Sequence, residues 1–257
     1  MTKQEIVTTY KKKKKAAKYT YQIQCHQLHS AYCQELQAYK AQHATKPILD
    51  PPKRSVLEEI GNAITHGVGA LFAIVAYLFM LFSSDNATDV VAASVYFFGL
   101  FVMFSMSCLY HSFRHGSKVK RLFRRFDYSC IYLLIGATFA PLLLCYVGGT
   151  YGSIFLIVQW SIIATGITFI GVFGPMRMRP LHITLYLVLG WSAMLFLPQM
   201  LGKDIWFFIY ILAGGIIYSL GIIPFSLNKK SAHFIWHFFV LGGAIVQWLG
   251  IYFYLYL

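Results

Sequence analysis

Long runs that lack Asp, Glu, Lys and Arg alternate with short charged connections along most of this chain. These runs are Ile60–Ser84, Val90–Phe113, Tyr128–Met176, Pro180–Gly202, Ile205–Asn228 and Ser231–Leu257. A membrane-spanning helix needs about 20 mostly apolar residues, so five of these runs have room for one helix each. The run 128–176 has room for two, and Gly148, Gly149 and Gly152 indicate where it breaks. The pattern predicts an all-α, polytopic membrane protein with seven transmembrane helices, because a helix pairs its own backbone groups in lipid.

Positive charge is concentrated on one side of the predicted membrane. Of the 22 Lys and Arg residues, 21 lie in the N-terminal tail or in the connections 114–125, 174–180 and 229–230. Lys203 alone lies in a connection on the other side. Because cytoplasmic loops carry the excess of Lys and Arg, this distribution predicts a cytoplasmic N-terminus and a C-terminus outside. It also accounts for the net charge of +13, so nucleic acid is not an expected partner.

Composition supports a membrane protein and divides the chain in two. Only 12% of the residues are charged, whereas a soluble domain has about 25%. Residues 1–54 form a basic cytosolic tail, expected to be partly helical or disordered, and residues 55–257 form the membrane domain. The run Lys11–Lys15 is suited to contact with anionic lipid. In the tail, the stretch CHQLHSAYC (residues 25–33) has no common metal-site spacing, so an amphipathic helix is preferred over a metal clip.

Ionisable side chains inside a membrane are costly and are functional candidates for that reason. Asp127 begins the third predicted helix on the cytoplasmic side. His111 ends the second helix, and His233 and His237 begin the seventh. The predicted topology brings these four side chains to the cytoplasmic side of the membrane from three different helices.

The spacing of the histidines favours a metal site. His233 and His237 are four residues apart and therefore share one helix face, and two imidazoles at this spacing can bind one ion. His111 from another helix would complete three protein ligands and leave a fourth position for water, as in catalytic zinc sites. Asp127 would hold that water and take its proton. Ser107 shares a helix face with His111.

Two features of the same residues have simpler explanations. Asp127 alone is compatible with an interfacial ion pair to Arg124 or Arg125. The spacing of His233 and His237 alone is also compatible with two hydrogen-bonded histidines. Among metals, iron bound by two histidines and a carboxylate is an alternative, but it leaves one histidine unused, and a di-iron oxygenase needs more histidines than this chain offers. Zinc is therefore preferred.

Three further histidines lie near the cytoplasmic ends of predicted helices. His115 forms a second pair with the same spacing as His233 and His237, together with His111, but it lies beside Gly116 and is expected at the interface. His66 and His182 are candidates for groups behind the ligands, or for substitutes of one of them.

Four segments of the membrane domain carry a resemblance to a known family. They are EEIGNAITHGVGA at the first helix, SMSCLYHSF at the end of the second, FRRFDYSCIYLLIGATFAPLLL in the third and SAHFIWHFFVLGGA in the seventh. From about residue 58 to 257 the chain resembles the progestin and adipoQ receptor family, and within it the bacterial haemolysin III branch. The resemblance implies seven transmembrane helices, a cytoplasmic N-terminus and a location in the cell membrane, the bacterial plasma membrane in particular. It also implies zinc held by His111, His233 and His237, a water on the zinc held by Asp127, and Ser107 close by.

The same resemblance implies a relation to membrane hydrolases that include alkaline ceramidases, and three functional hypotheses follow. The first is a zinc hydrolase that cleaves an amide or ester bond of a ceramide-like or other acyl lipid, with Asp127 as general base and Ser107 as a hydrogen-bonding group. The second is a membrane sensor or receptor-like protein in which zinc is structural. The third is a cytolytic membrane protein, against which the tail and the seven spans argue. Substrate and oligomeric state stay open.

Overall fold

The computed structural model describes residues 2–42, 51–227 and 229–257, and every regular element in these residues is a helix. Seven of the described helical segments are long and apolar enough to cross a membrane, which confirms the predicted fold class. Five of them are single helices: Val56–Phe82 (α2), Ala87–Ser112 (α3), Gly149–Phe173 (α5), Ile205–Ser226 (α8) and Ala232–Leu255 (α9). The span Lys118–Val147 consists of α4 (Lys118–Pro141) and the π-helical η1 (Leu142–Val147). The span Arg179–Lys203 consists of α6 (Arg179–Trp191), the 3-10 helix η2 (Ser192–Phe196) and α7 (Leu197–Lys203).

The N-terminal tail contains one long helix, α1 (Lys3–Gln42). The chain divides into two compact units, with the division between residues 48 and 49. The helix includes the run Lys11–Lys15, and its apolar side chains, such as Tyr21 and Leu28, are exposed. The helix-compatible stretch of the tail is therefore helical within the described residues.

The polar connections supply the groups that begin and end the spans. Side-chain oxygens accept hydrogen bonds from the first amides of four spans, which removes unpaired donors at the helix N-termini. These capping residues are Ser55, with Glu58 completing a capping box, Asn86, Ser117 and Asp204. The break predicted in the longest uncharged run falls at Gly148, whose φ of 65° ends one span before Gly149 begins the next.

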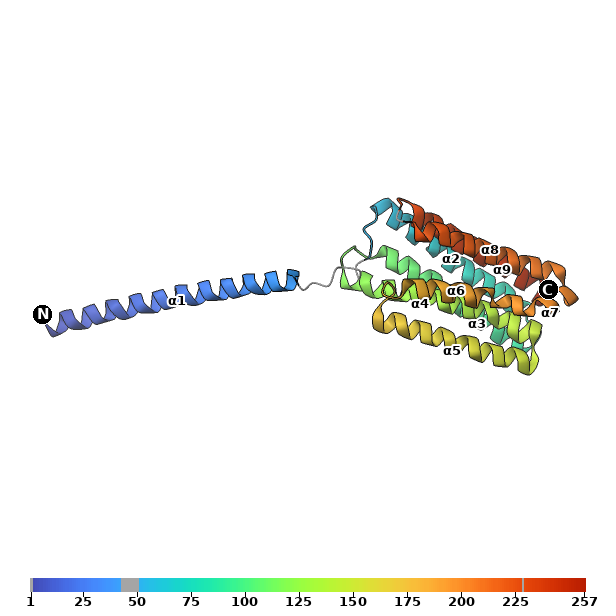
Figure 1. Ribbon diagram of the computed structural model, residues 1–257, viewed down its shortest axis with the longest axis horizontal. Helices are drawn as coiled ribbons and strands as arrows, with labels where there is room; N and C mark the ends of the chain where they lie inside the picture. The colour runs from blue at the N-terminus through green and yellow to red at the C-terminus, as the bar shows by residue number, and fades with distance from the viewer. Residues whose placement is uncertain (1, 43–50, 228) are drawn as a thin grey trace. The chain divides into compact units, whose positions relative to one another are not determined.

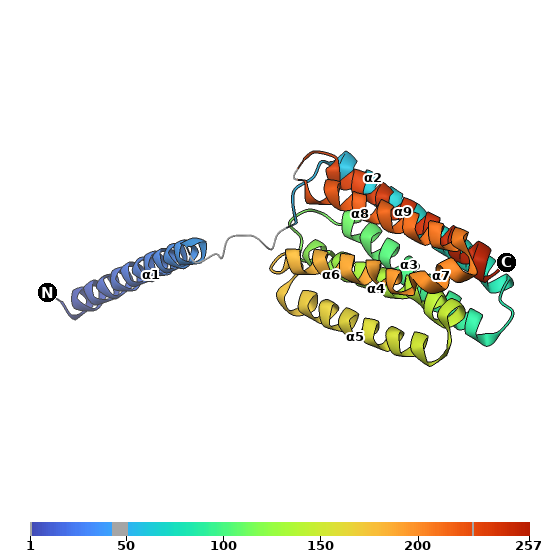
Figure 2. The same ribbon diagram turned by 45° about the vertical axis from the view of Figure 1, so that its right-hand side comes forward.

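The seven spans pack side by side as one bundle (Figures 1 and 2). α3 lies between α2 and α4, and α8 lies along α9, which in turn contacts α2. The close approach of α3 and α4 depends on Gly99, because a Cβ atom there would overlap the Cβ of Ala137. α6 packs more sparsely against α4, α5 and α8, and a cavity lies along this side of the bundle.

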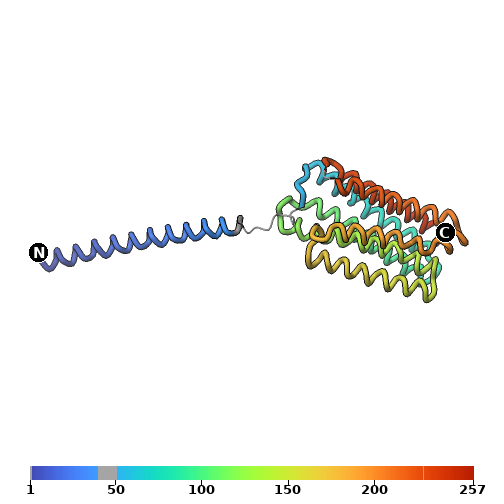
Figure 3. The backbone as a smooth tube through the Cα atoms, in the orientation of Figure 1, coloured from blue at the N-terminus to red at the C-terminus, as the bar shows by residue number. Residues whose placement is uncertain are grey.

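The connectivity gathers four helix ends at the same end of the bundle. The tube view shows the start of α2, the end of α3, and the starts of α4 and α9 together, with the C-terminus at the opposite end (Figure 3). This shared end is the one for which the charge distribution predicts a cytoplasmic location. The predicted site residues Ser107, His111, Asp127, His233 and His237 come from three of these helix ends, those of α3, α4 and α9.

Candidate metal centre

Local structure at the start of α9 places two of the predicted ligands. α9 begins at Ala232, and Ser231 before it has a φ of 61°. The Ser231 amide donates a hydrogen bond of 2.5 Å to Oε1 of Glu58, which belongs to the capping box at the start of α2. The first turns of α9, with His233 and His237, are therefore tied to the first turn of α2.

His111, His233 and His237 come together as predicted. Their ligand atoms all lie within 4.8 Å of one another, and within the described residues this is the one group of three or more His, Cys, Asp or Glu side chains arranged in this way. The stretch 25–33 in α1 therefore forms no such group. The Nε2 atoms of His111 and His233 are 3.3 Å apart. Two nitrogens bound to one tetrahedral zinc ion at about 2.0–2.1 Å lie about 3.3–3.4 Å apart, so the observed spacing fits this ion.

The hydrogen bonds behind the rings direct the lone pairs into the site. Nδ1 of His111 is 2.6 Å from Oε2 of Glu59, so it carries the proton and donates to the carboxylate. Nδ1 of His237 is 3.2 Å from the backbone oxygen of Asn62 and donates to it. In both rings Nε2 is left as the free ligand atom. Metal-binding histidines ordinarily donate their second nitrogen to a carboxylate or a carbonyl in this way, so the donor set fits a metal ion.

A buried lysine completes the support of His111. Lys120, in the first turn of α4, is only 1% exposed. Its Nζ lies 2.9 Å from Oε1 of Glu59, donates to the backbone oxygen of Phe113 at 3.0 Å, and lies 5.0 Å from the ring centre of Tyr110. Glu59 therefore joins α2 to α3 through His111 and to α4 through Lys120. A carboxylate fixed by two partners holds the His111 ring in one orientation.

Ser107 lies one turn before His111 on α3, and Asp127 lies in α4 outside the group of three histidines. Asp127 is 8% exposed and Ser107 1% exposed, and Ser107 is close enough to Asp127 for its hydroxyl to interact with the carboxylate. In the part of the chain that the structure describes, both ion pairs within 4.0 Å involve Glu59, and none involves Asp127. Arg124 instead lies over the Tyr128 ring, and Arg125 donates to the backbone oxygen of Gly171 at 2.8 Å. The simple interfacial ion pair of Asp127 is therefore absent from the described contacts.

The other histidines occupy three different environments. His66 on α2 is buried and stacks on the ring of His237, with ring centres 3.7 Å apart. Neither of its ring nitrogens has a hydrogen-bond partner among the described residues. Nδ1 of His182 on α6 is hydrogen-bonded to the hydroxyl of Tyr132 at 2.9 Å. His182 lies outside the group of three histidines. His115 is exposed beyond the end of α3, where the sequence places it.

Sequence reasoning missed Glu59, Asn62 and Lys120. A signal for the first two was present, because Glu59, Asn62 and His66 are spaced three and four residues apart and share one face of α2. In the sequence, Glu59 looks like an ordinary acid in the first turn of a helix. No pattern indicates that Lys120 turns inward, since it lies in a basic stretch of the kind that faces the cytoplasm.

Comparison with known proteins decides the family. Residues 54–248 match the sequence model described as Haemolysin-III related, and this range includes every residue of the candidate site. The chain belongs to the haemolysin III family. This confirms the resemblance in the sequence, and with the seven spans it makes the chain a multi-pass membrane protein.

Relatives of this haemolysin III family member occur in bacteria and mammals. It is 37% identical over 207 residues to Hemolysin-3 of Bacillus cereus, covering 77% of this chain and 92% of the relative. It is 36% identical over 205 residues to a Hemolysin-3 homolog of Bacillus subtilis, covering 78% and 95%. The human Monocyte to macrophage differentiation factor is 29% identical over 210 residues, covering 79% and 87%. The bacterial relatives indicate the cell membrane as the location.

Proposed function

We propose that this protein is a zinc-dependent hydrolase that cleaves an amide or ester bond of a membrane lipid at the end of the bundle predicted to be cytoplasmic. The observation that carries the proposal is the convergence of His111, His233 and His237, backed by Glu59 and the Asn62 carbonyl. Three neutral imidazoles with an open fourth position are typical of catalytic zinc. A purely structural zinc site is ordinarily closed by a fourth protein ligand.

Asp127 supplies the acid–base group of the proposed reaction. A zinc ion in this site would polarise a carbonyl group and lower the pKa of water. Asp127 is buried and has no ion-pair partner within the described residues, so its carboxylate is available to accept a proton from the attacking water. The nearby hydroxyl of Ser107 would donate to this carboxylate and orient it. Asp127 would then return the proton to the leaving amine or alcohol.

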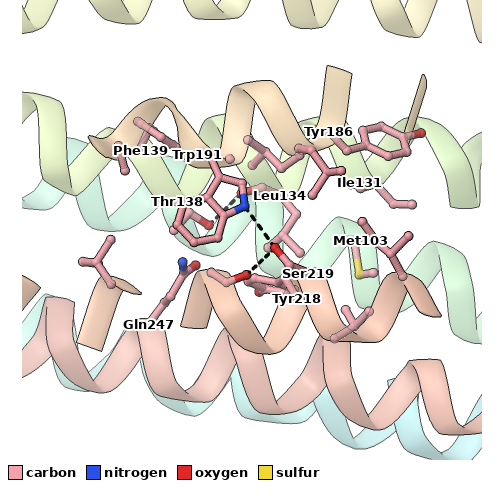
Figure 4. A pocket seen from close by; sticks show the side chains of 18 of the residues that line it. Met103, Ile131, Leu134, Thr138, Phe139, Tyr186, Trp191, Tyr218, Ser219 and Gln247 are labelled. Carbon is pink, nitrogen blue, oxygen red and sulfur yellow. Dashed lines mark hydrogen bonds between the residues drawn. The ribbon is translucent and has the colours of Figure 1, made fainter. Parts of the chain in front are cut away.

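An apolar cavity beside the centre suits the acyl part of a lipid. Side chains of α4, α6, α8 and α9 line a cavity of about 110 Å³ that is partly open to the surroundings. Figure 4 shows mostly apolar side chains along the cavity. Among the few polar groups are Gln247 and Ser219, whose hydroxyl accepts a hydrogen bond from Trp191. Phe225 and Trp236 line the cavity, and the Phe225 ring centre is 6.2 Å from that of His233. An acyl chain in the cavity would therefore bring its carbonyl group toward the histidines.

The test is an Asp127→Asn variant of the full chain, with Asp204→Asn as the matched control because Asp204 caps α8 at the far end of the bundle. Zinc content and release of fatty acid from a panel of amide and ester lipids are measured for each variant. We expect Asp127→Asn to keep its zinc and to lose about 100-fold in turnover, while the control keeps both. Unchanged turnover in Asp127→Asn contradicts the proposed role.

A receptor-like protein with structural zinc is the second candidate. It is favoured by the way the three histidines join α3 to α9, so that an ion would fasten two helices at one end of the bundle. Zinc removal lowers the thermal stability under both proposals. Release of fatty acid separates them, because a structural ion supports no turnover on any lipid of the panel.

A further inference from the structure

Two buried arginine nitrogens near the candidate metal centre lack partners. Nη1 of Arg54, just before α2, and Nη1 of Arg124, in α4, are shielded from solvent and have no hydrogen-bond partner among the described residues. Arg124 as a whole is only 5% exposed. A buried donor without an acceptor costs free energy, and more so on a charged group. Their placement therefore indicates acceptors that the protein itself does not provide.

Both arginines interact with the same few residues. Arg54 is close enough to Tyr110, Asp127 and His233 to interact with them electrostatically. Arg124 is also in electrostatic range of Asp127 and His233. The stacking of Arg124 over the Tyr128 ring, with 5.9 Å between its Cζ and the ring centre, holds this guanidinium in place. The two arginines therefore lie in the neighbourhood of the candidate metal centre, Arg124 one turn before Asp127 on the buried side of α4.

Near the two guanidinium groups, the one carboxylate without a strong partner among the described residues is Asp127. Glu59 is engaged by His111 and Lys120, and Glu58 accepts from the amide of Ser231. Asp127 is the remaining carboxylate near the two arginines, and it forms no ion pair within 4.0 Å in the described part of the chain. A divalent cation held by neutral imidazoles would add further positive charge. Guanidinium groups bind phosphate and carboxylate oxygens through paired N–H donors.

We propose that Arg54 and Arg124 form an anion subsite, so that the lipid bound at this centre carries a phosphate or carboxylate group next to the histidines. This inference rests on the proposed function only in taking the occupant to be an acyl lipid. The shared chemistry is an anionic oxygen group, whose source is either a phosphate headgroup or the carboxylate released by acyl hydrolysis. An uncharged lipid would leave both Nη1 atoms unpaired and would bind more weakly.

Native mass spectrometry of the zinc-loaded full chain in neutral detergent tests the subsite. The probes are two matched pairs, lysophosphatidic acid with monoacylglycerol, and oleate with oleyl alcohol. We expect each anionic probe that fits to bind about tenfold or more tightly than its uncharged counterpart. The pair with the larger ratio identifies the source as phosphate or carboxylate. Equal affinities within both pairs in the wild-type protein overturn the proposal without any variant.

A charge-matched pair of variants separates the subsite from general attraction to a basic protein. Arg54→Gln with Arg124→Gln removes the two proposed donors, and Arg125→Gln with Arg177→Gln removes the same charge from outside the site. The first double variant should lose the preference and keep its zinc, and the second should keep both. A preference that survives in the first variant, or disappears equally in both, contradicts the subsite. If the protein prefers anionic probes but hydrolyses no lipid, only the proposed reaction is contradicted. If it hydrolyses uncharged lipids and binds anionic and uncharged probes equally, only the subsite is contradicted.

Discussion

Replacement of Glu59 by Gln perturbs the metal centre without touching a ligand. The variant keeps the shape of the side chain and an oxygen that accepts from Nδ1 of His111. It removes the negative charge that faces this nitrogen at 2.6 Å and Lys120 at 2.9 Å. A neutral acceptor makes the imidazole a weaker base and holds its orientation less firmly, so Nε2 becomes a weaker ligand.

The expected magnitude follows from these two contacts. Loss of a group that supports a metal-binding histidine costs about 10- to 100-fold in metal affinity, or about 1.4–2.8 kcal/mol. Lys120 separately loses its carboxylate while it stays buried. Breaking such a pair costs about 3 kcal/mol, the lower end of the usual range, because the Glu59 side chain is 15% exposed. The variant should therefore show weaker metal binding and, in the metal-free state, lower thermal stability.

Competition with a zinc chelator of known affinity, in detergent at constant pH, measures the first effect, and thermal unfolding of the metal-free protein measures the second. Glu58→Gln is the matched control, because its amide oxygen still accepts from the Ser231 amide. We expect a change in zinc affinity of less than about threefold for this control. The double variant Glu59→Gln, Lys120→Met should recover the stability, since the uncompensated charge is gone, but not the metal affinity.

The reasoning is refuted if Glu59→Gln binds zinc as tightly as the wild-type protein does. It is also refuted if the double variant recovers zinc affinity together with stability. In that case Glu59 acts on the packing of Lys120, and the orientation of His111 does not depend on it.

Three further predictions concern the ligands, the packing and the topology. His233→Ala and His237→Ala should each remove most of the bound zinc, as measured by metal analysis of the purified protein. The control His115→Ala replaces an exposed histidine and should retain the zinc. Equal zinc content in all three variants contradicts the assigned ligands. Gly99→Ala should destabilise the protein by about 1–3 kcal/mol, because the new Cβ overlaps Ala137, while Gly215→Ala, which meets open space, should not lower the unfolding temperature. If Cys25, an exposed residue of α1, is kept as the single cysteine, an impermeant maleimide should label it only in permeabilised cells, and labelling of intact cells contradicts a cytoplasmic N-terminus.

The sequence alone was sufficient for the spans and for the grouping of the three histidines. Hydrophobic length is a local property, and a segment such as 231–257 must cross the membrane whatever its neighbours are. The break at Gly148 follows from the conformational freedom of glycine in the same local way. The candidate residues His111, Asp127, His233 and His237 could be selected because ionisable groups in apolar helices are costly. Their location near the cytoplasmic side of the membrane followed from the predicted order and orientation of the spans.

The tertiary structure decided which nitrogens meet and what holds them. The rotation of each helix about its own axis is set by packing, as at the contact of Gly99 with α4, and hydrophobicity carries little information about it. Whether Nε2 or Nδ1 of His111 faces the site depends on Glu59, which belongs to a helix some fifty residues earlier. The inward turn of Lys120 depends on the same carboxylate. Contacts between side chains of different helices depend on three-dimensional packing, and for this reason the histidines were predictable from the sequence and their supporting groups were not.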